Sequence, residues 1–155
     1  MTEQIEVMRR LWRERSVSIA GQHHTIRGAG LAPRPEQAVP VWIGARAPAA
    51  LQRVGMMADG WFAPHGLTEA GYATARKMID RAAQAAGRKP SDVAMEGRVS
   101  AKASDLDQLV ESVEMWDRRG ASHVSVVTLQ DDLRSVDAHL ARLHAVAEHL
   151  MLDAP

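Results

Sequence analysis

The sequence has no cysteine among its 155 residues. This absence excludes disulfide bonds, thiolate metal ligands and a cysteine nucleophile. The chain also lacks net charge, because 19 basic residues balance 19 acidic ones. The basic residues are mostly Arg, and they are scattered among the acids rather than clustered. This distribution argues against a nucleic-acid partner, whose phosphates need a basic surface.

Long apolar runs are missing as well. No segment approaches the roughly 18 residues that a membrane-spanning helix needs, and the first residues do not follow the pattern of a signal peptide. We therefore expect no membrane partner and a cytoplasmic protein. A length of 155 residues suits a single domain, residues 1–155, with a proper core.

Common catalytic and metal signatures are also absent. The sequence contains no GxSxG, Walker, GxGxxG or zinc motif. Three of the His residues, His139, His144 and His149, recur every fifth position. Five residues step about 140° around a helix, so these side chains do not share one face. We expect solvated or hydrogen-bonded histidines and no metal site.

The most informative stretch is residues 39–62, VPVWIGARAPAALQRVGMMADGWF. Its first five residues form a short apolar run that suits a buried strand. Gly44 breaks the run, and Pro48 stands where the first residue of a helix tolerates a missing N–H. Apolar residues then recur at helical spacing until Asp59-Gly60, after which a second apolar run starts. The stretch therefore predicts a strand, a glycine turn, a helix and a strand.

The residues before this stretch predict a helix and a hairpin. Thr2 is expected to cap a helix that runs to about Arg13, with Ile5, Met8, Leu11 and Trp12 on one face. Short alternating runs at 16–20 and 23–26 indicate a hairpin. Residues 28–40 are rich in Gly and Pro and are expected to be irregular.

The residues after it predict three helices and two strands. Thr68 opens the first helix and Gly87 ends it. Residues 93–100 alternate as a strand does, and a capping box of Ser104 and Asp107 opens a second helix, which Gly120 closes. A strand at 123–128 and a helix capped by Ser135 follow. The positions expected to face the core are Tyr72, Ala75, Ile79, Ala82 and Ala86, then Leu106, Leu109, Val110, Val113 and Trp116, then Leu140, Leu143, Ala147 and Leu150.

This element order predicts an α/β fold. A helix and a short hairpin precede four βα units, with strands near residues 40–43, 60–63, 93–99 and 123–128. Such units imply parallel strands in sequential order, joined by right-handed crossovers. A closed (β/α)8 barrel needs about 250 residues, so we predict a partial (half) TIM barrel. The competing fold is a small doubly wound sheet, in which the strand order would reverse.

The turn after the first of these strands is the strongest candidate for a binding site. A helix N-terminus offers oriented N–H groups to a phosphate, and Arg46 adds a positive charge. We therefore predict an anion site at Gly44, Ala45, Arg46 and Ala47. The alternative is an ordinary βα turn with a solvated Arg46.

Five other positions are considered for chemistry. Glu96 and Arg98 share a strand face, where a barrel would place them inside near its C-terminal mouth. We favour a structural role for both, as a mutual ion pair or paired with strands outside the chain. His65 is expected at the rim of an active site, and Asp59 is expected to be a helix-end residue rather than an acid catalyst. Trp61 either lines a ligand cavity or packs in the core.

The segment PVWIGARAPAALQRVGMMADGWF resembles the motif of the bacterial-luciferase-like monooxygenases, which are flavin- or deazaflavin-dependent oxidoreductases on a TIM barrel. QIEVMRRLW and GQHHTIRGAGLAPRP before it, and EGRVS, GASHVSVVT and LRSVDAHLARL after it, follow the C-terminal half of that family. The resemblance covers about half of such a protein. It implies that residues 1–155 correspond to strands five to eight of the family barrel.

The resemblance also implies a cofactor, FMN or the deazaflavin coenzyme F-420, and a small organic substrate. In the family, the backbone after this strand helps to hold the cofactor phosphate, which assigns that role to Gly44, Ala45, Arg46 and Ala47. The family usually has a second Gly where this chain has Ala45. The flavin ring would perform hydride transfer or monooxygenation. Much of the ring-binding surface comes from the N-terminal strands of the family, so no catalytic residue is named and the chain is expected to be inactive alone.

A different class of function is also open. The chain would then be a non-catalytic remnant, or an interaction subunit that complements a separate N-terminal half. In either case, the first and last strands of a half barrel are edges with unpaired backbone groups. We therefore expect a homodimer or pairing with a complementary half-barrel.

Overall fold

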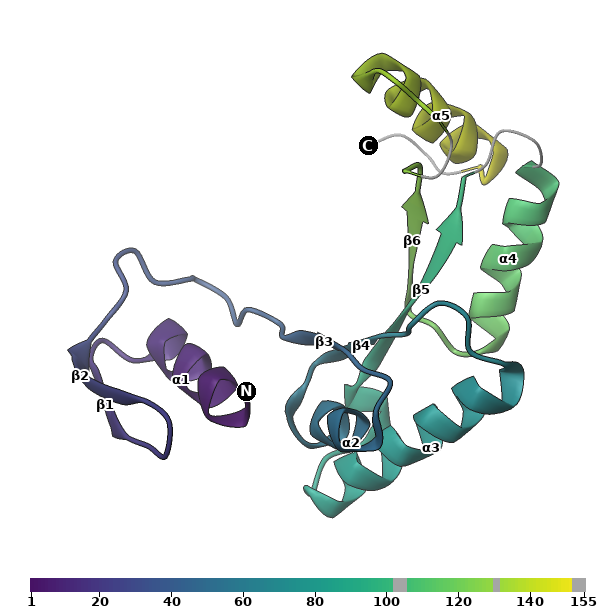
Figure 1. The fold of residues 1–155 in the computed structure, drawn as a ribbon. Helices are drawn as coiled ribbons and strands as arrows, with labels where there is room; N and C mark the ends of the chain where they lie inside the picture. Colours follow the sequence, from purple (N-terminus) through teal and green to yellow (C-terminus); the bar gives the residue numbers. More distant parts are fainter. Residues whose placement is uncertain (102–105, 130–131, 152–155) are drawn as a thin grey trace.

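The structure is a computed structural model that describes residues 1–101, 106–129 and 132–151. A helix and a two-stranded antiparallel hairpin come first, and four parallel strands that alternate with helices follow (Figure 1). The elements are α1 Thr2–Arg13, β1 Val17–Ala20, β2 Thr25–Ala29, β3 Trp42–Gly44, α2 Pro48–Met57, β4 Gly60–Phe62, α3 Glu69–Ala85, the 3-10 helix η1 Pro90–Asp92, β5 Ala94–Ser100, α4 Leu106–Arg118, β6 His123–Val127 and α5 Val136–His149.

The four-stranded sheet has the order β3-β4-β5-β6, and every pair is parallel. The described strands thus follow the sequence without a reversal, as right-handed crossovers of one helix each require. The predicted partial TIM barrel is confirmed, and the doubly wound alternative is wrong. In the register of the sheet, Gly44 lies beside Phe62, Phe62 beside Glu96, and Glu96 beside His123.

One face of the sheet forms the core with the helices. Its strand residues include Ile43, Trp61, Met95 and Val99, which belong to the same buried cluster as Leu51, Val54, Tyr72 and Ile79 of the helices. The alternation expected for residues 93–100 is confirmed, because Val93, Met95 and Val99 are buried while Arg98 and Ser100 are exposed. The opposite face, which would be the interior of a closed barrel, carries polar and aromatic side chains.

Local sequence signals explain most helix ends. The hydroxyls of Thr68 and Ser135 accept hydrogen bonds from the N–H groups of Gly71 and Ala138, as predicted for N-caps. Gly87 and Gly120 have φ angles of 72° and 78°. After each glycine the chain turns back, and the N–H groups of Arg88 and Ala121 donate to the carbonyls of Ala83 and Trp116 at 2.9 Å and 3.0 Å. Glycine ends both helices because it adopts this left-handed conformation without strain.

One capping prediction is wrong and another is not tested. Thr2 is the first helical residue, and Met1 is the N-cap of α1. The Thr2 hydroxyl accepts a hydrogen bond from Arg53 at 3.2 Å. The capping box of Ser104 and Asp107 depends on Ser104, which lies outside the described residues.

Some apolar positions are more exposed than the sequence predicted. Met8 is 41% exposed, whereas α1 buries Ile5 and Val7, which lie about 200° apart around the helix. The helix therefore buries two sides rather than one face. Ala86 is exposed because it is the C-cap of α3.

Leu140 and Leu143 of α5 are 51% and 40% exposed, contrary to the prediction of a buried face. The helix is turned so that Val146 is buried, and His139 and Arg142 bond to the Thr128 hydroxyl and the Ala101 carbonyl. Since β6 is the last strand in the described sheet, no further strand lies beside it for the two leucines to cover.

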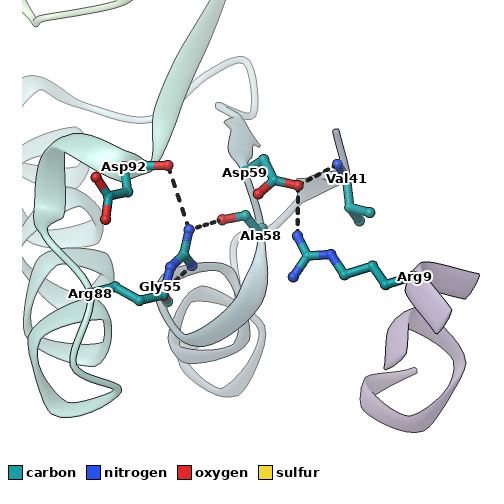
Figure 2. A network of polar contacts seen from close by, with 7 residues as sticks. All are labelled: Arg9, Val41, Gly55, Ala58, Asp59, Arg88 and Asp92. Atoms are coloured by element: carbon teal, nitrogen blue, oxygen red, sulfur yellow. Dashed lines mark hydrogen bonds and ion pairs between the residues drawn. The ribbon is translucent and has the colours of Figure 1, made fainter. Parts of the chain in front are cut away.

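Polar contacts hold α1 at the amino ends of the strands (Figure 2). A guanidinium nitrogen of Arg9 lies 2.6 Å from a carboxylate oxygen of Asp59, and the N–H of Val41 donates to the same oxygen at 2.7 Å. Arg88 donates to the carbonyls of Gly55 and Ala58 at 2.8 Å and 2.7 Å and so secures the end of α2. Asp59 directly follows the C-cap of α2, as predicted for a helix-end residue.

Close packing at Gly97 provides a test of the core. A Cβ at this position would overlap the ring of Trp116, whose indole N–H donates to the carbonyl of Arg98 at 3.2 Å. We expect Gly97→Ala to lower the free energy of unfolding by about 1–3 kcal/mol, measured by urea denaturation and circular dichroism. The control is Gly44→Ala, whose Cβ would meet the Cβ of Phe62 at an ordinary 4.0 Å. Equal stability of the two variants would contradict the packing described.

Candidate functional site

The carboxyl ends of β3 and β4 open into a hollow of about 340 Å³, here called the strand-end hollow. It is lined by Gly44, Ala45, Arg46, Phe62, Ala63, Pro64, His65 and Arg98. The structure thus brings three of the four predicted binding residues together with His65 and Arg98. The fourth, Ala47, is not part of the lining but is the N-cap of α2.

Strand length explains why Arg98 reaches this hollow. β3 and β4 have three residues each, whereas β5 has seven. Phe62, the last residue of β4, lies beside Glu96, and the N–H of Ala63 donates to the Glu96 carbonyl at 3.1 Å. β5 continues past this level, so Arg98 stands next to the residues that follow β4. The prediction of Arg98 near the C-terminal mouth of the barrel is confirmed.

A buried hydrogen bond anchors the loop between β3 and α2 to the core. Ala45 is buried, and its carbonyl accepts a hydrogen bond of 2.9 Å from the indole nitrogen of Trp61, a side chain with 0% exposure. Of the two roles predicted for Trp61, the structure shows the core role rather than the lining of a ligand cavity. The side chain contacts the loop through its hydrogen bond to Ala45 and does not line the hollow.

The backbone of this loop presents free donors. The carbonyl of Ala47 accepts from the N–H groups of Ala50 and Leu51 at 2.9 Å and 3.0 Å, and Pro48 has no N–H. Within the described residues, the N–H groups of Arg46, Ala47 and Ala49 have no hydrogen-bond acceptor. Donors at the N-terminus of a helix point toward an anion and favour its charge.

Neither Gly44 nor Ala45 adopts a left-handed backbone conformation. Gly44 is the last residue of β3, and a Cβ added there would make only ordinary contacts. Ala45 has no positive φ, and its side chain belongs to the core cluster. The methyl group that replaces the second glycine of the family motif therefore does not fill the hollow.

The charged side chains around the hollow are basic. Arg46 and Arg98 contribute to the lining together with His65, and no Asp or Glu of the described residues lines it. Of the two structural roles expected for Glu96 and Arg98, the mutual ion pair is not formed among the described residues, because the Glu96 carboxylate accepts a hydrogen bond of 2.5 Å from the Ser125 hydroxyl. Pairing with strands outside the chain stays a prediction. Neither Arg46 nor Arg98 has a side-chain partner among the described residues.

One feature of the inner face could not be read from the sequence. Trp42 packs against Phe62 with ring centroids 5.4 Å apart, and against His123 at 5.1 Å. The sequence signal for it is Gly60, whose missing side chain leaves room for the Trp42 ring on the neighbouring strand. The stack places aromatic surface next to the hollow, since Phe62 also lines it.

The described ranges show no metal-binding cluster and no membrane-spanning helix. Within residues 1–101, 106–129 and 132–151, no group of three or more His, Asp or Glu side chains is arranged to hold a metal ion. His24, His139 and His149 each contact a side chain, namely Glu3, Thr128 and Asp107. None of the helices in those ranges combines the length and apolar character needed to cross a bilayer.

Comparison with known proteins identifies the family. The model of the luciferase-like monooxygenase family matches residues 1–124. An F420-dependent glucose-6-phosphate dehydrogenase of Microbacterium testaceum (strain StLB037) is 32% identical over 120 residues. Because the family model covers most of the chain, the protein belongs to the luciferase-like monooxygenase family.

Solved structures share the fold. The coenzyme F420 dependent tetrahydromethanopterin reductase from Methanopyrus kandleri superposes with a TM-score of 0.70 at 15% identity, covering 90% of this chain and 60% of that one. A riboflavin lyase solved with modified FMN superposes with a TM-score of 0.53 at 16% identity, covering 74% of this chain and 30% of that one. These likenesses confirm a partial luciferase-type barrel. Relatives thus include F420-dependent proteins and one solved with modified FMN.

The chain is short relative to these proteins. The match to the Microbacterium dehydrogenase takes in 75% of this chain but 35% of the relative. The family is one of flavin- or F420-dependent oxidoreductases, and the present chain spans a part of its barrel.

The hydrogen bond beneath the loop can be tested directly. We expect Trp61→Phe to lower the free energy of unfolding by about 1–2 kcal/mol, because the Ala45 carbonyl loses its donor in a buried place. Hydrogen exchange at the Ala50 and Leu51 amides, which donate to the Ala47 carbonyl of this loop, should also become faster. The matched control is Trp42→Phe, on the opposite face of the sheet, which should leave exchange in this loop unchanged. Slow exchange in the Trp61 variant would show that the loop does not depend on this bond.

Proposed function

We propose that residues 1–155 are the C-terminal half of the barrel of a flavin- or deazaflavin-dependent oxidoreductase, and that this half holds the cofactor phosphate. The assignment to the C-terminal half follows the resemblance of the sequence segments to that part of the family. The binding residues are Gly44, Ala45, Arg46 and Ala47. The observation that carries the proposal is the strand-end hollow, where open N–H donors and positive side chains meet without a carboxylate.

The chemistry of this donor set suits a phosphate. Arg46, Ala47 and Ala49 offer backbone N–H groups, and the Arg46 guanidinium adds a charge-assisted donor. The α2 dipole adds partial positive charge at the same end. Gly44 contributes by lacking a side chain, because an ordinary side chain here would project beside Phe62 at the hollow.

The cofactor is F420 or FMN, and the named relatives favour F420. The bound ring system would supply hydride transfer to or from a small organic substrate. The residues of this chain would position the cofactor by its phosphate, and aromatic surface from Phe62 would lie alongside. Groups that orient the ring and the substrate are expected from strands outside residues 1–155.

A non-catalytic role is the second candidate. The observation that favours it is the pair of open strands: β3 has only β4 as a neighbour and β6 only β5 in the described sheet. As an interaction subunit, the chain would complete a barrel with a complementary half or a second copy. Titration of the purified protein with FMN and F420 separates the two roles, because a cofactor-binding half gives a saturable signal even at an affinity weaker than micromolar, whereas an interaction subunit gives none.

Phosphate binding is the first test. We expect inorganic phosphate to shift the amide NMR signals of Gly44 to Ala47, and Arg46→Gln to weaken the affinity about fivefold through loss of one exposed charge. The control Arg27→Gln, at an exposed position on β2, should bind phosphate as the wild type does. Shifts concentrated elsewhere, with Gly44 to Ala47 silent, would refute the proposed site.

Cofactor affinity and turnover are the second test. The chain alone should bind FMN and F420 more weakly than micromolar and should not turn over, since a cofactor held mainly by its phosphate remains poorly oriented. Fluorescence titration gives the affinity, and absorbance assays of cofactor reduction give the activity. Micromolar binding together with turnover by the pure protein would overturn the expectation.

Association is the third test. We expect the chain to form a homodimer, or larger species when no complementary half is present, because both edge strands have open backbone groups. Phe62→Lys should weaken the association, since it puts a charge on an inner-face residue that is 40% exposed. Light scattering over a concentration series measures the mass, with Arg27→Gln as the control. A well-behaved monomer at the highest concentration would show that the edges need no partner.

A further inference from the structure

A groove lies between α2 and α3 on the outer side of the helices, here called the α2–α3 groove. The two helices pack side by side (Figure 1), and Gly55 lets them approach closely, because a Cβ there would overlap the Ile79 carbonyl oxygen. The groove has a volume of about 440 Å³. None of its lining residues belongs to the buried core cluster. They are Gln52, Met56, Met78, Arg81, Ala82, Ala85 and Ala86.

The α2–α3 groove is mainly apolar, since only Gln52 and Arg81 of its lining residues are polar. Met56 is 54% exposed, whereas Leu51 and Val54 of the same helix are buried in the core. The core of the half barrel therefore does not use the Met56 side chain. A methionine adapts its shape to an apolar partner, which makes it common at binding surfaces.

The α2–α3 groove is separate from the candidate site. Met56 is the last residue but one of α2, whereas the proposed phosphate site precedes Pro48, the first residue of the helix. The helices of a closed barrel form its outer ring, and a barrel containing this chain would be completed along the edges of β3 and β6. The groove would therefore stay open to solvent in a completed barrel as well.

The α3 side of the groove is basic. Arg81 lines the groove, and Lys77 lies one helical turn before it. Both side chains are exposed, and neither has a partner within the described residues. Asp80 of the same helix is already paired with Arg76 at 2.8 Å, and no Asp or Glu of the described residues lines the groove. Open cations beside an apolar surface favour a partner with carboxylates beside an apolar stripe.

The dimensions of the groove suit a short helix. From Met78 to Ala86, α3 rises about 12 Å, at 1.5 Å per residue. Apolar side chains at positions i, i+3 or i+4, and i+7 of a partner helix would span about 10.5 Å. An extended partner strand would need an open sheet edge, and two helices do not provide one.

We propose that the α2–α3 groove is a docking surface for an amphipathic helix of a partner protein, with Asp or Glu residues beside its apolar stripe. The apolar stripe would contact Met56 and Met78, and a carboxylate would pair with Arg81. Such a complex follows the helix-in-groove mode of recognition. The inference is independent of the proposed function, because the groove and the strand-end hollow have no residue in common.

Methionine methyl groups provide the readout. The experiment uses the whole 155-residue chain with 13C-labelled methyl groups on its eight methionines. The probe is a synthetic helical peptide of about 14 residues, or four turns, with a Leu stripe flanked by Glu. The matched control peptide has Lys at every Glu position. We expect the Glu peptide to shift the NMR signals of Met56 and Met78 and to bind about tenfold more tightly than the Lys peptide.

Two substitutions at exposed positions separate the charged contact from the apolar one. Arg81→Glu should weaken binding of the Glu peptide about fivefold and strengthen binding of the Lys peptide, whereas Arg27→Glu on β2 should change neither. Met56→Gln should weaken both peptides about threefold, through lost apolar contact. The matched control is Met8→Gln, at a methionine of α1 that is 41% exposed, and it should bind both peptides as the wild type does. Circular dichroism checks that each variant is folded.

Shifts at Met56 and Met78 together with a reduced preference for the Glu peptide in Arg81→Glu would support the docking surface. Equal affinity for the two peptides would overturn it, as would a Glu peptide that leaves both methyl signals unchanged. If the signals of Met56 and Met78 shift on dilution of the protein without peptide, the groove binds a second copy of the chain, and the acidic partner is refuted.

Discussion

The register of the parallel sheet is the constraint on which the candidate site depends. It sets the end of β3 level with the end of β4 and lets β5 run on beyond both. Arg98 therefore stands beside the loop after β4, although 33 positions separate it from His65 in the sequence. Two glycines allow close packing on this sheet, since Gly60 leaves room for Trp42 on one face and Gly97 for Trp116 on the other.

The two faces of the sheet have different roles, one in the core and one at the candidate site. The outer face and the helices form a complete apolar core, in which Trp61 and Trp116 are nearly fully buried. The inner face has Phe62, Glu96 and Arg98 at positions that a closed barrel would enclose. The chain has an apolar core of its own, and its inner face offers part of the proposed site. The match covers 35% of the Microbacterium dehydrogenase.

Local signals in the sequence predicted the helices, the strands and their order, because glycine, proline and hydroxyl caps act within a few residues. The loop Gly44 to Ala47 was predicted for the same reason. The pairing of Glu96 with Ser125, the stack of Trp42 on Phe62 and the exposure of Leu140 and Leu143 were not predicted. Each of these features depends on which strand is the neighbour in the sheet, or on which strand lies at its edge. The periodicity of a sequence does not indicate either.

The central claim is that this half barrel holds a cofactor phosphate at the carboxyl end of β3. A crystal structure of the chain with FMN tests it most directly. The account predicts the phosphate over Gly44 to Ala47, within hydrogen-bonding distance of the Arg46 guanidinium and the backbone N–H groups that begin α2. An ordered phosphate bound at another part of the surface, with this loop open to solvent, would contradict the account.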